Sequence, residues 1–250
     1  MSGSLRRFPD MINFGGTIDV TTLDYPGKVA MVIFFRGCPF RCIYCQNYRL
    51  LFEENLVKEE VIEEKIKEAR AFISAVVFSG GEPFMQFDGL LSLSKYVKDL
   101  GLLVGIETCG YYPDRIRELG ELGLIDTLFL DVKAPLDDPE MYTRITGPER
   151  ATERVKDSLN VAIDADFELE VRTTVFNGLL GSEEILRIAS SLEGFGGRYV
   201  IQEGIPDLAA EDEIKHLPPF TYDQMLDLRE VASRYLKRVG IRTREHGLEI

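Results

Sequence analysis

The sequence predicts an α/β protein built on a parallel sheet, and two observations lead to this fold class. Short runs of apolar, β-branched and aromatic residues alternate with longer stretches whose apolar residues recur at helical spacing. Such alternation forms β/α/β units with parallel strands and right-handed crossovers. Six units follow residue 29, and they can either wrap into a partial barrel or lie flat as a doubly wound sheet. In both arrangements ligands bind beyond the carboxyl ends of the strands.

The predicted strands are short apolar runs. VAMVIFF at 29–35 is predicted as a buried strand, because its β-branched and aromatic residues follow one another without interruption. FELEVRTTV at 167–175 alternates between apolar and polar residues before it becomes β-branched, which is also typical of a strand. Further strands are expected at 75–80, 102–107, 125–132, 198–202 and, as a short final one, 241–245.

The predicted helices lie between these strands. Val57, Val61, Ile62 and Ile66 recur at helical spacing with Glu and Lys between them, which indicates an amphipathic helix over 57–70. Capping and turn residues mark the other helices. They are expected over 89–99 after Asp88, 113–120 from Pro113, 149–163, from Ser182 onward, and over 221–239 up to Gly240.

The 250 residues predict a single domain, because no linker, repeat or low-complexity stretch divides the chain. Residues 1–28 are expected to form an N-terminal extension, either a short hairpin or an edge piece. The β/α core is expected over 29–205, followed by a C-terminal helix and tail over 206–250.

The composition is that of an ordinary globular protein, with 45% hydrophobic and 28% charged residues. The longest apolar run, 29–35, is far shorter than the ~20 residues of a membrane span. The N-terminus has no apolar stretch typical of a secretory signal, so we expect a cytoplasmic protein. The net charge of −13 repels phosphate backbones, so nucleic acid is not an expected partner.

Three of the four cysteines lie within eight residues, in the string RGCPFRCIYCQN that follows the first core strand. Cys38, Cys42 and Cys45 have the spacing C-x3-C-x2-C, and the fourth cysteine, Cys109, is remote. Clustered cysteines in a cytosolic chain indicate metal binding before disulfides. Three thiolates leave one iron of a [4Fe–4S] cluster without a protein ligand, as a catalytic site requires. A zinc site on the same cysteines, with Cys109 as fourth ligand, is the alternative.

Four short motifs end later strands. They are SGGEP at 79–83, ETCG at 107–110, DVK at 131–133 and VRT at 171–173. Glycines let a backbone approach a ligand closely, and a buried Arg needs a carboxylate partner. Each motif also has a simpler explanation: a glycine turn, a capping acid, a surface ion pair or a solvent-facing Arg.

The pattern C-x3-C-x-aromatic-C, with Tyr44 as the aromatic residue, resembles the signature of the radical S-adenosylmethionine (SAM) superfamily. The ETCG and DVK motifs are similar to those of its glycyl-radical-enzyme activating enzymes. The opening FGGTIDVTTLDYPGKVAMVIFFRGCPFRCIYCQN is similar to anaerobic ribonucleoside-triphosphate reductase activating proteins. The resemblance implies a partial (β/α)6 TIM-like barrel. Two residues depart from it: Cys109 stands where the family has Asn, and Gln202 is nearest to a position where some relatives have His.

The resemblance also implies roles for site residues. Cys38, Cys42 and Cys45 would hold a [4Fe–4S] cluster, and SAM would chelate its fourth iron. The amino group of SAM would be held by Ser79, Gly80, Gly81 and Glu82. Its carboxylate and ribose would contact Arg172 and Lys133, and its adenine would lie against Tyr44. Its ribose or methionine part would be oriented by Glu107 and Asp131, with Gln202 nearby. Glu107 and Asp131 could instead bind a monovalent cation.

The implied activity is that of an oxidoreductase. It cleaves SAM reductively to a 5′-deoxyadenosyl radical, which takes hydrogen from a glycine of a partner enzyme, the anaerobic ribonucleotide reductase. Flavodoxin or ferredoxin would supply the electron. We expect the partner to contact residues 13–28 and the loops after the fifth and sixth strands. The alternatives are a radical SAM enzyme with a small-molecule substrate and a non-catalytic zinc module.

Overall fold

The computed structural model describes residues 10–250 and is built on one sheet of ten strands. The strands lie in the order β10-β9-β8-β7-β6-β5-β4-β2-β1-β3. They are β1 Met11–Thr21, β2 Ala30–Phe35, β3 Leu56–Lys58, β4 Ala75–Gly80, β5 Leu103–Thr108, β6 Thr127–Asp131, β7 Glu168–Val175, β8 Arg198–Glu203, β9 Val239–Thr243 and β10 Gly247–Glu249. From β2 to β9 in this order all neighbours pair in parallel. The predicted parallel α/β fold is confirmed.

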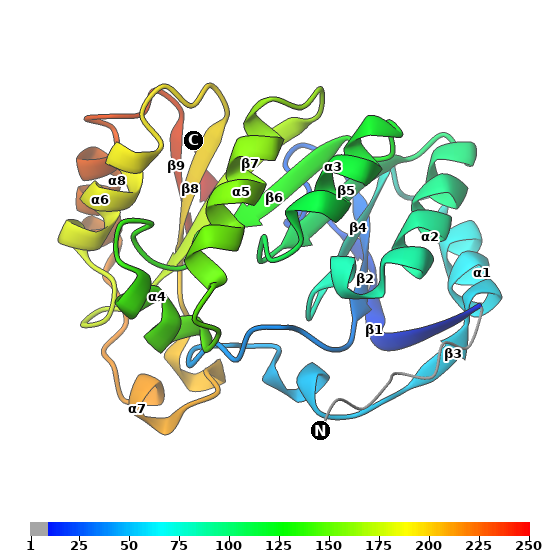
Figure 1. Ribbon diagram of the computed structural model, residues 1–250, viewed down its shortest axis with the longest axis horizontal. Helices are drawn as coiled ribbons and strands as arrows, with labels where there is room; N and C mark the ends of the chain where they lie inside the picture. The colour runs from blue at the N-terminus through cyan, green and yellow to red at the C-terminus, as the bar shows by residue number, and fades with distance from the viewer. Residues whose placement is uncertain (1–9) are drawn as a thin grey trace.

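Helices connect the parallel strands and cover the outer face of the curved sheet, which forms a partial barrel (Figure 1). They are α1 Glu59–Ala69, α2 Phe87–Asp99, α3 Pro113–Glu121, α4 Pro139–Thr146, α5 Ala151–Ile163, α6 Ser182–Ser191, α7 Asp212–Lys215 and α8 Tyr222–Ala232. Three short 3-10 helices add η1 Tyr48–Leu51, η2 Pro83–Gln86 and η3 Pro206–Leu208. Within residues 10–250, no helix is long and apolar enough to cross a bilayer.

The main hydrophobic core lies between the sheet and the helices, because each helix buries the apolar face that its periodicity creates. In α1 this face includes Ile62 and Ile66, both fully buried. A smaller cluster fills the inside of the barrel at its amino end, where the Tyr25 ring lies edge-on to Phe129 at 5.7 Å. The hydroxyl of Tyr25 shares a 2.7 Å hydrogen bond with Thr127. This packing closes the floor of the barrel and leaves its carboxyl end for the site.

The N-terminal extension adds a strand to the parallel sheet. Its strand β1 pairs antiparallel with the first core strand β2, from Phe14 opposite Phe35 to Thr21 opposite Ala30. The β1–β2 turn therefore lies at the amino ends of the parallel strands. Residues 1–9 of the predicted extension lie outside the described residues.

The C-terminal part corrects an expectation about helix length. The helix predicted over 221–239 ends at Ala232, and Gly240 lies inside β9 instead of ending a helix. Val239 and Ile241 are buried β-branched residues that pair with β8, so packing on the sheet edge overrides the helical pattern. Helices α4 and α7 and strands β3 and β10 were not predicted.

Candidate functional site

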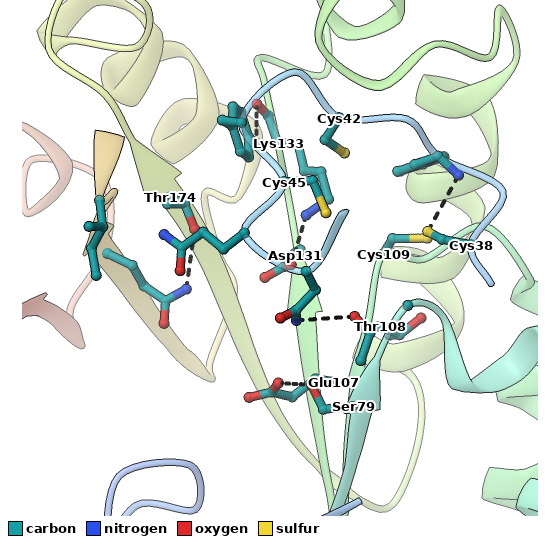
Figure 2. A pocket seen from close by; sticks show the side chains of 18 of the residues that line it. Cys38, Cys42, Cys45, Ser79, Glu107, Thr108, Cys109, Asp131, Lys133 and Thr174 are labelled. Carbon is teal, nitrogen blue, oxygen red and sulfur yellow. Dashed lines mark hydrogen bonds and ion pairs between the residues drawn. The ribbon is translucent and has the colours of Figure 1, made fainter. Parts of the chain in front are cut away.

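A cavity of about 360 Å³ opens at the carboxyl ends of the strands (Figure 2). One wall is formed by the loop between β2 and η1 that carries three cysteines, and the opposite wall is formed by the ends of β8 and β9. The residues predicted for the site that line it are Cys38, Cys42, Tyr44, Cys45, Ser79, Gly80, Gly81, Glu107, Asp131, Lys133 and Gln202. Glu82 and Arg172 were also predicted for the site, but they do not line the cavity.

The cysteine loop is held by backbone hydrogen bonds to the end of α4. The amide of Arg41 donates to the Thr146 carbonyl at 2.7 Å, and the amide of Ile43 donates to the Ile145 carbonyl at 3.1 Å. A tight turn from Cys42 to Cys45, closed by a 3.0 Å backbone bond, turns both side chains toward the cavity. These backbone bonds therefore fix the position of the loop.

The two glycines of SGGEP allow the cysteine loop to pack on the end of β4. The Gly81 amide donates to the Phe35 carbonyl at 2.8 Å, and the Glu82 amide donates to the Gly37 carbonyl at 2.9 Å. A Cβ atom on Gly81 would lie 2.0 Å from the Gly37 oxygen, and Gly80 has a φ of +110° that favours glycine. The close approach that the sequence indicated is thus made by the protein backbone, although both glycines also face the cavity.

The thiols surround open space. Cys42 and Cys109 are buried, whereas Cys38 and Cys45 are partly exposed. Burial raises the pKa of the Cys42 thiol to about 12 and also raises that of Cys45, while the nearby Lys133 ammonium lowers both. A metal must therefore displace protons to bind here.

The donor set does not fit a single metal ion. Within residues 10–250, no three His, Cys, Asp or Glu side chains are close enough together to hold one. This geometry argues against a zinc site with Cys109 as the fourth ligand. Three soft thiol donors spread around a common cavity fit an iron–sulfur cluster, whose irons each take one thiolate.

The carboxylate of Glu82 is fully buried behind the cavity wall. It accepts hydrogen bonds from the Thr108 hydroxyl at 2.9 and 3.0 Å, from the Cys109 amide at 2.7 Å and from the Phe84 amide at 3.1 Å. Burial raises its pKa, and these donors lower it in part. Glu82 thus fixes the end of β5, which differs from the predicted direct contact of its carboxylate with an ammonium group.

Arg172 is also engaged by the protein. Its guanidinium is 3% exposed, binds Glu107 and Glu170, and lies 3.9 Å from the centre of the Phe129 ring. Burial alone would lower its pKa, but these two carboxylates raise it. Glu107, which also accepts a hydrogen bond from Ser79, does line the cavity. Arg172 therefore orients a cavity residue from behind the wall.

Lys133 and Asp131 form an ion pair of 2.8 Å at the end of β6, close to the cysteine loop (Figure 2). Burial would lower the pKa of Lys133, but Asp131, Cys42 and Tyr44 raise it well above its ordinary value, so the ammonium stays charged. The Tyr44 ring stacks on Phe176 at 5.0 Å. Protein cations already face both Glu107 and Asp131, the carboxylates suggested for a monovalent cation.

The wall opposite the cysteines contains the expected Gln202 and two arginines, Arg242 and Arg244, that were not expected at the site. Gln202 donates to the Thr174 hydroxyl at 3.4 Å and accepts from Arg242 at 3.0 Å. Arg242 lies on β9 and Arg244 directly follows this strand, and both line the cavity. The alternating stretch IRTR signalled a strand, but only its parallel pairing with β8 brings it to the site.

Comparisons with known proteins agree with this geometry. The Radical SAM superfamily matches residues 32–191. A Methanocaldococcus jannaschii protein described as a candidate glycyl-radical enzyme activating enzyme is 32% identical over 94% of this chain and 98% of its own length. The pyruvate formate-lyase-activating enzyme of Clostridium pasteurianum is 30% identical over 66% of this chain and 69% of the enzyme.

Two solved structures show the same fold. Streptococcus suis SuiB bound to its precursor peptide SuiA has a TM-score of 0.65 at 16% identity, over 85% of this chain and 48% of SuiB. TYW1 with a bound lysine-pyruvate adduct has a TM-score of 0.63 at 18% identity, over 87% of this chain and 77% of TYW1. From its sequence matches, its fold and its cysteine loop, the chain belongs to the radical SAM superfamily, and within it to the activating enzymes of glycyl-radical enzymes.

Proposed function

We propose that this protein activates an anaerobic ribonucleoside-triphosphate reductase, with Cys38, Cys42 and Cys45 as the ligands of its cluster. Radical SAM enzymes use a [4Fe–4S] cluster and SAM as cofactors. Held by these cysteines, the cluster would supply the one-electron chemistry that cleaves SAM and removes a hydrogen atom from a glycine of the partner. The observation that carries this proposal is the loop that brings the thiols of Cys38, Cys42 and Cys45 to one wall of the cavity.

The residues of the chain bind and orient SAM in this proposal. The backbone at Ser79–Gly81 and the Glu107 carboxylate line the same cavity as the cysteine loop and would bind the methionine amino group. The Lys133 ammonium and the Asp131 carboxylate provide a donor and an acceptor for the SAM carboxylate and ribose. Glu82 and Arg172 act as positioning residues, because each holds a part of the wall that faces SAM.

The glycine loop of the partner must enter at the carboxyl end of the barrel. The loops after β7 and β8 border this opening, since Phe176 stacks on Tyr44 and Ile205 lines the cavity. Residues 17–28 were expected to contribute, but β1 runs antiparallel to β2 and carries them to the opposite end. We therefore limit the proposed partner surface to residues 13–16 and the two loops. Flavodoxin or ferredoxin is the proposed electron donor.

A small-molecule substrate is the second candidate, and the wall of Gln202, Arg242 and Arg244 favours it. Arg242 has one guanidinium nitrogen in a hydrogen bond and another that is buried without a partner. A carboxylate or carbonyl of a small substrate could bind there. The same donors could also bind a backbone carbonyl of a glycine loop.

The test uses protein reconstituted with iron and sulfide without oxygen. We expect a cluster that is lost in Cys42→Ala and kept in the matched variant Cys109→Ala. With dithionite, SAM and the reductase, the wild type should give a glycine-centred doublet in electron paramagnetic resonance (EPR). Bound zinc, or uncleaved SAM, contradicts the proposal. Formation of 5′-deoxyadenosine without a doublet favours the small-molecule alternative.

A further inference from the structure

A second cavity lies at the amino ends of the strands. Its volume is about 330 Å³, close to the 360 Å³ of the first cavity, and the two share no lining residue. Its walls come from the β1–β2 turn, the first residues of β6, β7 and β8, and the loops 164–167 and 192–197. These loops lie at the opposite end of the barrel from the cysteine loop (Figure 1).

Two arginines line this second cavity side by side. Arg198 is the first residue of β8, and Arg238 comes directly before β9. The Tyr199 amide donates to the Arg238 carbonyl at 2.9 Å, so the two arginines are neighbours on adjacent parallel strands. Like charges in such positions repel each other. An anion bound between the two guanidinium groups would remove this repulsion.

The carboxylates of the protein do not satisfy these two guanidinium groups. Arg198 donates to Glu170 at 3.0 Å, but Glu170 also accepts from Arg172 at 2.7 Å. The Nε of Arg198 is buried and has no hydrogen-bond partner in the described part of the chain. Arg238 is exposed and forms no ion pair with a described residue, and Glu168, the other acid of this cavity, pairs with neither arginine. Because a buried donor without an acceptor costs free energy, a ligand oxygen here would be stabilising.

The other walls of the second cavity leave room for a flat apolar group. The rings of Phe167 and Phe195 are half-buried, and the packed rings of Tyr25 and Phe129 also line the cavity. Gly196 has no atom within 4 Å of the position of a Cβ, so the space beside these rings is open. Aromatic walls with a few polar groups are typical of sites for small organic ligands, and Arg binds carboxylates and phosphates through paired donors.

We propose that the second cavity binds a small organic anion that carries an aromatic ring. Its carboxylate or phosphate lies on Arg198 and Arg238, and its ring packs against Phe167 and Phe195. This inference is independent of the proposed function, because the two cavities are built from different residues.

The experiment is isothermal titration calorimetry of the reconstituted enzyme without oxygen. Phenyl phosphate and phenylacetate carry both the ring and the charge, inorganic phosphate carries only the charge, and benzyl alcohol carries only the ring. At least one of the first two should bind about tenfold or more tightly than either of the last two, because it gains both ring burial and charged hydrogen bonds. The tighter of the two identifies the head group. Absence of binding by both, or an equal affinity for inorganic phosphate, overturns the inference.

Variants then place the bound probe. Arg238→Gln should weaken its binding about tenfold, because a charge-assisted hydrogen bond is lost. The Arg238 side chain is exposed, so this variant should fold normally. The matched control Arg244→Gln, in the first cavity, should leave the affinity unchanged. An unchanged affinity in Arg238→Gln, or an equal loss in Arg244→Gln, overturns the inference and leaves the proposed function intact.

Discussion

Replacing Arg172 with Met tests the charged network that supports the cavity. The substitution leaves Glu170, whose side chain is 4% exposed, with Arg198 as its remaining cation at 3.0 Å. Breaking a buried ion pair costs about 3–5 kcal/mol, because one charge stays buried without its partner. The loss is smaller here, because Arg198 still pairs with Glu170 and the Glu107 side chain is 26% exposed. We therefore expect the free energy of unfolding to fall by about 3 kcal/mol.

The assay is urea unfolding of the cluster-free, reduced protein, followed by circular dichroism. With a slope of about 3 kcal/mol per molar urea for a chain of this size, the midpoint should fall by about 1 M. The midpoint of Arg172→Lys should fall less, because Lys keeps the positive charge although it cannot reach both carboxylates. The double variant Arg172→Met with Glu170→Gln should recover part of the loss. An unchanged midpoint in Arg172→Met, or no recovery in the double variant, refutes this reasoning.

Three further predictions concern the cavity and the two ends of the barrel. Gly81→Ala should assemble less than half as much cluster as the wild type, because the new Cβ collides with the Gly37 backbone. Iron content measures this. The control Gly196→Ala, with no atom within 4 Å of its Cβ, should have the wild-type iron content. Arg242→Ala should raise the KM for the partner about tenfold or more, as expected for the loss of a charged hydrogen bond. SAM cleavage measured without the partner should be unchanged. A parallel loss of SAM binding would contradict this prediction. Leu23→Asp should leave glycine activation unchanged, because this exposed side chain lies in the β1–β2 turn at the closed end; a clear loss in the EPR doublet would show that the partner reaches that end.

The local sequence determined the features that lie within short segments. The alternation of strand and helix patterns depends on neighbours a few residues apart, and the parallel sheet followed from it. The spacing of Cys38, Cys42 and Cys45 within one loop indicated a metal centre for the same reason. The motifs at the ends of β4, β5 and β6 were placed at one edge, because parallel strands all end on the same side.

Tertiary structure alone decided which side chains meet. Glu82 and Arg172 were expected to contact SAM. In the fold Glu82 bonds to Thr108 at the end of β5, and Arg172 pairs with Glu107 of β5, so both side chains hold the cavity wall. Arg242 joins the cavity because β9 pairs with β8, and Cys109 joins it because β5 ends at the same edge of the sheet. These contacts link segments far apart in the chain, and packing and burial select them. Local periodicity carries no information about such partners.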